Sequence, residues 1–298
     1  MSRSENHLIR SYPTRREFGA AAVAMLAPAL GRAQSGVLTA GEIVNRIKKN
    51  IGIPWNDKTY RDTFKIGGPE MRVRGIASTF MSTLDVLQRA NEAGKNFIVT
   101  HEPTFWSDGD IVKDLGNDPL YRYKLEFAQK NNLIVWRFHD HWHAMKPDGI
   151  FLGWNKALGW DKYLVNSDQR MYNLPPMTLA AAATHIAKSL QSRSVRVIGD
   201  PNLMVSKVGR GAHTLSGNMA VLPKVDMVLI SEAREWDSIE YVRDTVASGQ
   251  KKGAVIVSHE AGEEAGMDEC ATWLRNFVSE VPIEFVPTHD HLWIAAKV

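Results

Sequence analysis

Three short apolar runs in this 298-residue chain each end at histidine or carboxylate residues. Residues 96–100 lead into His101 and Glu102, residues 133–136 lead into a histidine-rich segment that starts at His139, and residues 254–258 lead into His259. Continuous apolar runs of this length are typical of buried parallel strands. Open α/β sheets place their sites beyond the carboxyl ends of such strands, so the pattern predicts an α/β fold with a site at these ends.

The residue types at these strand ends indicate a metal site. Imidazole and carboxylate groups without a nearby thiolate suit divalent Zn, Mn, Fe, Co or Ni. Cys270 is the only cysteine, so no disulfide can form within the chain. It lies in a helical pattern, which favours a packed core thiol over a nucleophile.

The spacing of the histidines leaves two interpretations of the middle segment open. His259 and Glu263 are four residues apart and share a face if a helix starts there. If the strand before His139 continues, alternation puts His139, His141 and His143 on one face. Alternatively, only one of the three is a ligand, and then His143 is the first candidate and His139 the second.

The first 33 residues have the order of an export signal. A twin-arginine pattern at residues 14–18 precedes an apolar stretch of 12 residues at 19–30 and a small-residue cleavage site at 31–33. The stretch is too short to span a bilayer, which needs about 20 apolar residues. We expect periplasmic export with cleavage after Ala33; the alternative is an amphipathic tail or an uncleaved anchor.

Cleavage would leave a chain without net charge. Residues 1–33 hold five of the 36 basic and two of the 33 acidic residues, so 31 of each remain. No electrostatic case is left for binding nucleic acid or an anionic membrane. The remaining 265 residues are enough for one large or two small domains.

Apolar periodicity alternates between strand and helix along the rest of the chain. A pair of prolines at residues 175–176 predicts a break, and residues 209–213 predict a tight turn. Helices are expected at residues 39–51, 84–93, 119–131, 178–190, 238–247 and 268–278, and further strands at 75–80, 195–199, 207–209, 227–230 and 292–298.

Four segments resemble motifs of a known family. Residues 99–106 resemble the His-His-Pro segment of the NIF-three-like dinuclear metal-centre family (type 2 GTP cyclohydrolase I-like), and residues 138–150 resemble its His-Thr-Asn-Leu-Asp segment. Residues 229–236 look like its Gly-Glu strand end, and residues 258–264 look like its His-x3-Glu segment. The resemblance covers most of residues 37–290.

The resemblance implies a fold and an assembly. The expected fold is α/β, with two interlocked layers, mixed sheets and a metal site at strand carboxyl ends. We expect a first half at residues 37–160 and a second half at 161–298 that completes the site. Family members bind two metal ions at the centre of a toroidal hexamer, so a homo-oligomer is expected.

At two positions this sequence has a different residue type from the family's metal ligand. Glu102 stands where the family has a second histidine, and His143 stands where it has a metal-binding aspartate. Whether one or two ions remain is therefore open. The implied ligands are His101, Glu102, His143, His259 and Glu263, with His139 as a further candidate.

The expected metal site and the export signal together predict an exported metal-dependent hydrolase that acts on an unknown small molecule. Glu102 and Glu232 are the candidate catalytic residues, each as a ligand or a general base. The alternative is a non-catalytic metal-binding or ring-forming interaction protein. An open coordination position beside a pocket favours the enzyme, whereas a saturated ligand set without a pocket favours the alternative.

Two weaker sets of residues complete the candidates. The segment at residues 289–291 repeats the histidine–aspartate–histidine pattern and is either an extra ligand or acid/base group or a solvated turn. Trp106, Trp142 and Trp236 lie beside the candidate ligands and either line an aromatic pocket or belong to the core.

Overall fold

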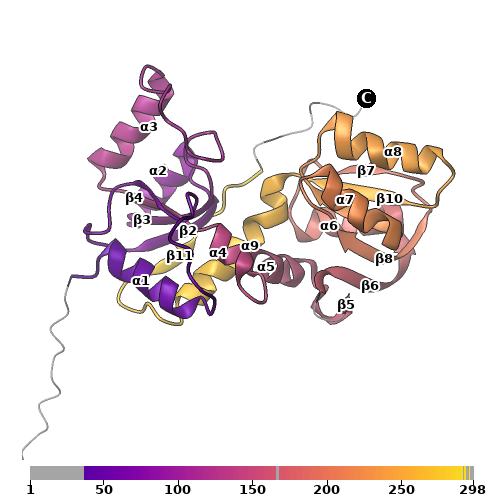
Figure 1. The fold of residues 1–298 in the computed structure, drawn as a ribbon, viewed down its shortest axis with the longest axis horizontal. Helices are drawn as coiled ribbons and strands as arrows, with labels where there is room; N and C mark the ends of the chain where they lie inside the picture. The colour runs from indigo at the N-terminus through magenta and orange to yellow at the C-terminus, as the bar shows by residue number, and fades with distance from the viewer. Residues whose placement is uncertain (1–36, 166–167, 291, 293–294, 296–298) are drawn as a thin grey trace, which may run out of the picture. The chain divides into compact units, whose positions relative to one another are not determined.

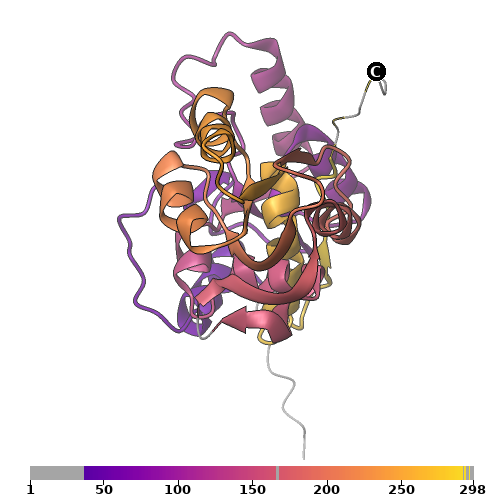
Figure 2. The same ribbon diagram turned by 90° about the vertical axis from the view of Figure 1, so that its right-hand side faces the viewer.

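Two β-sheets carry the apolar runs of the sequence, and helices pack against both (Figures 1 and 2). The computed structural model describes residues 37–298 except 166–167, 291, 293–294 and 296–298. The export segment expected at residues 1–33 and most of the strand expected at 292–298 lie outside the described residues. Within the described part, no helix combines the length and the apolar character needed to cross a membrane.

The first sheet has the strand order β1-β4-β3-β2-β11. The strands β2, β3, β4 and β11 are parallel, and β1 pairs with β4 in the antiparallel direction at the edge. Every residue of β3 is buried, as expected for a central parallel strand. The strands are β1 Phe64–Ile66, β2 Ile76–Met81, β3 Phe97–Glu102, β4 Ile134–Arg137 and β11 Ile283–Phe285.

The second sheet has the order β5-β6-β8-β9-β10-β7, with a parallel centre made of β8, β9 and β10. The break expected at the proline pair is wrong, because β6 runs through it. Proline cannot donate to a ladder, and the β6–β8 pairing shifts register between Asn173 and Met177. The strands are β5 Leu164–Val165, β6 Asp168–Thr178, β7 Arg196–Ile198, β8 Met204–Arg210, β9 Met227–Ser231 and β10 Gly253–Val257.

Several helices begin where a side chain accepts a hydrogen bond from the first turn. Thr39 and Glu42 form a capping box at the start of α1, and Ser258 caps α9 through the backbone N–H of Ala261. The cap at Ser258 starts α9 nine residues before the helix expected at 268–278. The helices are α1 Ala40–Asn50, α2 Leu84–Glu92, α3 Pro119–Lys130, α4 Asp140–Ala144, α5 Gly149–Leu158, α6 Leu179–Ser189, α7 Leu215–Val221, α8 Glu240–Ala247 and α9 His259–Leu274.

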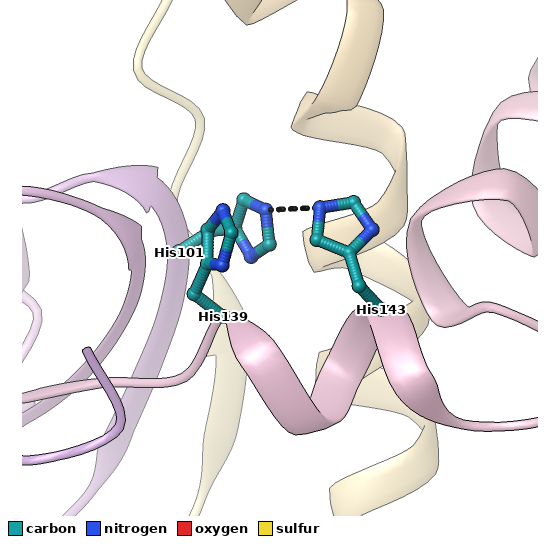
Figure 3. A group of neighbouring side chains, drawn as sticks. All are labelled: His101, His139 and His143. Carbon is teal, nitrogen blue, oxygen red and sulfur yellow. Dashed lines mark hydrogen bonds between the residues drawn. The ribbon is translucent and has the colours of Figure 1, made fainter. Parts of the chain in front are cut away.

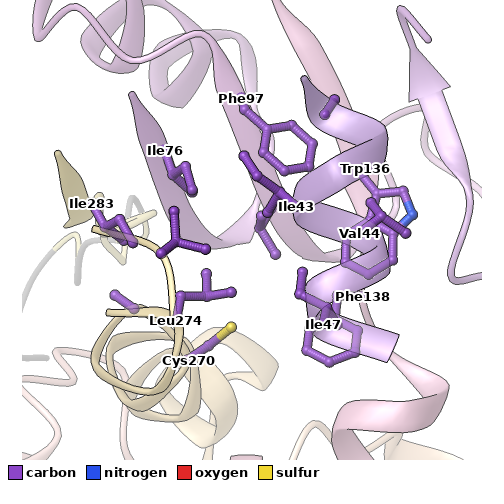
Figure 4. Packing of buried hydrophobic residues seen from close by; sticks show 14 of the residues in the cluster. Ile43, Val44, Ile47, Ile76, Phe97, Trp136, Phe138, Cys270, Leu274 and Ile283 are labelled. Atoms are coloured by element: carbon purple, nitrogen blue, oxygen red, sulfur yellow. The ribbon is translucent and has the colours of Figure 1, made fainter. Parts of the chain in front are cut away.

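Helix α9 links the cores of the two sheets. Ala261 in its first turn packs into the core of the second sheet, whereas Cys270 and Leu274 pack against strands of the first sheet (Figure 4). The Cys270 thiol is fully buried, and this burial raises its pKa to about 12. The cysteine is thus a core residue, as the helical pattern indicated.

The two sheets share chain segments. The chain leaves the second sheet through α9 and returns to the first sheet at β11, which pairs with β2. The first sheet therefore takes its last strand from beyond residue 160, and the halves are interlocked rather than consecutive.

Candidate metal centre

Residues at the carboxyl ends of both sheets form one cluster of imidazole and carboxylate groups. In the first sheet, β3 ends at Glu102 and β4 is followed by His139; in the second, β8 is followed by His213 and β10 by His259. The cluster thus combines groups from both sheets. We call it the imidazole–carboxylate cluster, and its members are His101, Glu102, His139, His143, His213, His259 and Glu263.

Glu263 occupies the centre of this cluster. Its Oε2 lies 3.2 Å from His101 Nε2 and 3.2 Å from His259 Nε2, and its Oε1 lies 3.3 Å from His213 Nε2. On the other side, His101 Nε2 lies 3.2 Å from His143 Nε2 (Figure 3). Three overlapping groups keep their possible ligand atoms within 4.8 Å: His101 with His139 and His143, His213 with His259 and Glu263, and His101 with Glu102 and Glu263.

Hydrogen bonds at Nδ1 orient the rings. His101 Nδ1 donates to the Phe138 carbonyl at 3.0 Å, and His213 Nδ1 donates to the Ser231 carbonyl at 2.7 Å. Since a carbonyl can only accept, each Nδ1 carries the proton and the neutral ring keeps a lone pair on Nε2. In three further rings Nδ1 faces a carboxylate at 2.9–3.0 Å: His139 with Asp140, His143 with Asp148, and His259 with Glu232.

This arrangement is typical of metal-binding histidines. A carboxylate or carbonyl behind the ring fixes the tautomer and makes the other nitrogen a better ligand. Five Nε2 atoms therefore belong to rings that are oriented for coordination. The set of five imidazoles and two carboxylates fits a divalent transition metal.

Two buried atoms at the centre support this assignment. Within the described chain, His259 Nε2 and Glu263 Oε2 have no hydrogen-bond partner of acceptable geometry, although both are buried. Leaving a buried polar atom without a partner costs about 1–3 kcal/mol. A metal ion bound between them would satisfy both atoms.

The charges of the cluster are shared unevenly. Burial, together with His101 and His143, lowers the pKa of His139 to about 2, so this ring is neutral. Burial also opposes ionisation of Glu263, but the adjacent imidazoles of His101, His213 and His259 outweigh it and hold the pKa of Glu263 well below its ordinary value. The centre therefore contains a carboxylate anion and a neutral imidazole, both of which are ligand forms.

Two buried arginines lie beside the two carboxylates of the cluster. Arg137 donates to Glu102 Oε2 at 3.1 Å and to the His101 carbonyl at 2.9 Å. Arg210 lies 3.6 Å from Glu263 Oε1 and donates to the Gly262 carbonyl at 3.0 Å. The anionic form of each carboxylate is stabilised by a guanidinium group.

The extended interpretation of the histidine-rich segment is wrong. The strand β4 ends at Arg137, and α4 begins at Asp140, so His139 and His143 are one helical turn apart. His141 lies on another side: its Nδ1 faces Asp62, its Nε2 accepts from the Asn56 backbone N–H at 2.9 Å, and its ring stacks on Trp55.

The structure brings together all six ligands expected from the sequence. Glu232, the second candidate catalytic residue, is half exposed and lies against His259 Nδ1 rather than at the centre. The His-x3-Glu spacing works as expected because α9 starts at His259. Metal binding by these residues stays a prediction, and the geometry names the side chains that would bind the ion.

The weaker candidates separate clearly. His289 is exposed and Asp290 accepts from Arg193 and Ser194, so neither joins the cluster, and residue 291 lies outside the described residues. Trp142 is core, whereas Trp106 and Trp236 are 55% and 62% exposed.

His213 is the member of the cluster that the sequence interpretation missed. Residues 209–213 predicted only a tight turn, although β8 extends to Arg210 and the chain then enters the site. The rule that located the other ligands applies here as well, since β8 is a parallel strand of the second sheet. The strand was expected at 207–209, but the glycine-rich segment after it was interpreted as a turn and not as a strand end that carries a ligand.

Comparison with known proteins assigns the family. The sequence profile of the Duf34/NIF3 (NGG1p interacting factor 3) family matches residues 38–291. The chain belongs to this family. A curated relative, the GTP cyclohydrolase 1 type 2 homolog of Clostridium perfringens, is 27% identical over 152 residues, which are 48% of this chain and 57% of the relative. The match therefore spans little more than half of that relative's length.

Solved structures of similar proteins support the fold. A hypothetical protein of Staphylococcus aureus matches with a TM-score of 0.68 at 15% identity, covering 87% of this chain and all of that one. A Bacillus cereus protein related to NIF3 matches with a TM-score of 0.65 at 14% identity, covering 89% of this chain and all of that one. The NIF3 fold expected from the motifs is confirmed.

Proposed function

We propose that this NIF3-family protein is a metal-dependent hydrolase that acts on a small molecule at the imidazole–carboxylate cluster. The observation that carries the proposal is the convergence of five oriented Nε2 atoms in one cluster, three of them on Glu263, with buried ligand atoms that lack partners. One or two divalent transition-metal ions bound there would supply Lewis-acid activation of water near neutral pH.

The number of donor groups is compatible with two ions. A tetrahedral zinc ion uses four ligands, and the cluster offers seven groups. His101 and Glu263 belong to two groups each, so they lie where two ions would share ligands. We therefore propose that His101, His143, His259 and Glu263 bind metal, with His139 and His213 completing the set.

Glu102 is the proposed general base. Arg137 binds its Oε2, which leaves Oε1 at 3.6 Å from His139 Nε2 and 3.7 Å from His259 Nε2. An oxygen in this position can coordinate a metal or accept a proton from an attacking water. Glu232 instead accepts from His259 Nδ1, so we propose that it positions this ring.

Open space beside the cluster favours an enzyme over a purely structural metal protein. A cavity of about 620 Å³ borders Glu102, and a second of about 640 Å³ borders Glu232 and His259. Each is large enough for a small-molecule substrate. The alternative of a non-catalytic metal-binding or ring-forming protein needs no such space.

Metal analysis of purified protein tests this proposal. We expect one or two transition-metal ions per chain, and we expect the double variant His259→Ala/Glu263→Ala to lose most of the metal while keeping its far-ultraviolet circular dichroism. His289→Ala, at an exposed histidine outside the cluster, is the matched control. Full metal retention in the double variant would refute the site.

A panel of hydrolase substrates separates the two functions. Hydrolysis that disappears with the metal in the double variant supports the enzyme. Bound metal without activity toward esters, amides or phosphoesters supports the non-catalytic alternative.

We also propose export and self-association, as the sequence led us to expect. Replacing Arg15 and Arg16 by lysine should keep the precursor in the cytoplasm, because the twin-arginine pathway recognises that pair. Light scattering on the purified protein should show a homo-oligomer, for which the family resemblance implies six subunits. An exported protein does not encounter cytoplasmic GTP, so we do not carry over the substrate in the curated relative's name.

A further inference from the structure

The cavity that borders Glu102 has walls of distinct chemistry. It lies between the end of β2, the segment that follows β3, and the first turns of α3. Apolar side chains make up most of its surface, and a lysine and an indole ring also face it. The residues used below are Met81, Leu84, Glu102, Trp106, Leu120 and Lys124.

Lys124 places a buried cation in this cavity. Its side chain is only 3% exposed, and its Nζ donates to the Thr104 carbonyl at 2.6 Å. An ammonium group has three hydrogens to donate, and the carboxylate that acts on the charge of Lys124, Asp110, forms its ion pairs with Lys65 and Arg137 instead. Burial lowers the pKa of Lys124 to about 8, so the group is still mostly cationic at neutral pH.

Trp106 adds an exposed aromatic surface to the same cavity. Its side chain is 55% exposed, and its backbone has a φ of 53°, a left-handed conformation that is uncommon for a residue with a side chain. The Lys124 Nζ lies 5.8 Å from the centre of its indole ring. A ligand group that meets the ammonium can therefore also contact the indole.

Two acidic residues, Glu102 and Asp108, line the cavity, and each is paired with arginine. Arg137 donates to Glu102 Oε2 at 3.1 Å. Asp108 accepts hydrogen bonds from Arg61 at 2.6 and 2.9 Å and from Arg137 at 3.2 Å. Its charge is thus balanced by two guanidinium groups, whereas Lys124 has no such partner among the residues described.

We propose that this cavity binds the non-reacting part of the substrate, and that this part is an aromatic or other apolar group that carries a carboxylate. The carboxylate pairs with Lys124, the apolar group lies on Trp106 between Met81, Leu84 and Leu120, and the reacting bond extends to Glu102. The assignment rests on the proposed function, because Glu102 connects the cavity to the imidazole–carboxylate cluster.

Binding of three matched probes tests the proposal without the reaction. The probes are 3-phenylpropanoate, its neutral amide and propanoate, titrated by calorimetry into the metal-free and the metal-loaded protein. We expect the carboxylate to bind about tenfold more tightly than the amide, since charge-assisted hydrogen bonds are the stronger ones. Propanoate, which lacks the ring, should bind at least tenfold more weakly.

Variants assign the effects to the two residues. Lys124→Met keeps the aliphatic stem and should abolish the preference for the carboxylate, whereas Trp106→Ala should weaken both aromatic probes. Exposed counterparts provide the controls: Lys113→Met and Trp236→Ala should bind like the parent protein.

Two outcomes would overturn the proposal. One is equal affinity of the parent protein for the carboxylate and the amide, which requires no variant to fold. The other is a carboxylate preference that survives in Lys124→Met. Because probe binding is measured in the metal-free protein as well, failure of the cavity assignment is distinguishable from failure of the hydrolase proposal, which appears in metal content and hydrolysis.

Discussion

Replacing Gly153 by alanine should damage the metal centre from a distance, because α5 and α9 cross with almost no space at this residue. A Cβ at Gly153 would lie 2.6 Å from Gly266 Cα, and the Ala265 carbonyl oxygen would be closer still. From the other side, a Cβ at Gly266 would lie 2.5 Å from Ile150 Cα. The obstacles are backbone atoms, which cannot rotate away as side chains do.

The size of the effect follows from this geometry. Ordinary contact begins at 3.4 Å, so the helices must separate by at least 0.8 Å at this crossing. Overpacking costs typically 1–3 kcal/mol, and a rigid obstacle favours the upper end of that range. Alanine recovers about 1 kcal/mol of helix propensity, so we expect a net loss of about 2 kcal/mol in the free energy of unfolding.

The displacement should also reach the ligands. Glu263 lies two residues before Ala265 on α9, and metal–ligand distances have to fit within about 0.2 Å. A shift of the helix should therefore lower metal affinity about tenfold or more, although Gly153 touches no ligand. A loss of metal affinity distinguishes a displacement of α9 from a change in overall stability alone.

Urea denaturation of the metal-free protein and metal titration of the folded protein measure the two effects. Gly116→Ala is the matched control, since a Cβ there meets nothing within 4 Å. It should leave both quantities nearly unchanged. A Gly153→Ala variant as stable as the parent protein, with unchanged metal affinity, would contradict this prediction.

Two further predictions concern stability and the assignment of the histidines. Because burial lowers the folded-state pKa of Lys124 from 10.5 to about 8, the unfolded state binds more protons between these values, and stability rises with pH across that window. Lys124→Met should therefore be more stable than the parent below pH 8, by at most about 3 kcal/mol, with the gain shrinking toward pH 10.5; an equal gain at every pH in urea denaturation would contradict this. His141→Ala should cost about 2–4 kcal/mol of stability and lower metal affinity by at most about 10–100-fold. His143→Ala should instead lower metal affinity sharply and cost little stability. His143→Asp should keep metal bound and move the metal-to-chain ratio, measured by elemental analysis, toward two; a silent His143→Ala would contradict the assignment.

The sequence predicted the strands and their ligands well because both signals are local. The strand β3 starts with three apolar residues, and its ligands His101 and Glu102 are the last two residues of the same strand. The two ligands on α9 could also be predicted from the sequence, because residues four apart such as His259 and Glu263 lie on one face once a helix starts there.

The histidine-rich segment could not be assigned from its own residues. Alternating histidines match a strand, yet Asp62 accepts from the backbone N–H groups of His139, Asp140 and His141 and turns the chain into α4. Asp62 lies 77 residues before His139, in a segment that carries no periodic signal of its own. A side chain distant in the sequence thus decided whether this segment forms a strand or a helix.

His213 was missed for a related reason. A glycine-rich segment is typical of a turn, and here Gly211 serves to bring the chain close to Asn218, where a Cβ would collide. The imidazole becomes recognisable as a possible ligand only when the second sheet puts the end of β8 near α9. Neither fact is encoded within a window of a few residues.

The distribution of the seven groups over the fold gives the cluster a structural role as well as a chemical one. Glu102 and His139 belong to the first sheet's strand ends, His213 to the second, and α9 supplies His259 and Glu263 while it packs into both cores. Metal bound at the cluster would therefore hold the two sheets together, and at a free concentration 100 times its dissociation constant it would contribute about 2.7 kcal/mol to stability. The meeting of ligands from the two sheets also accounts for Gly153 and Gly266 at the crossing of α5 and α9. These helices approach closely enough to bring the ligands together only because no side chain lies between them there.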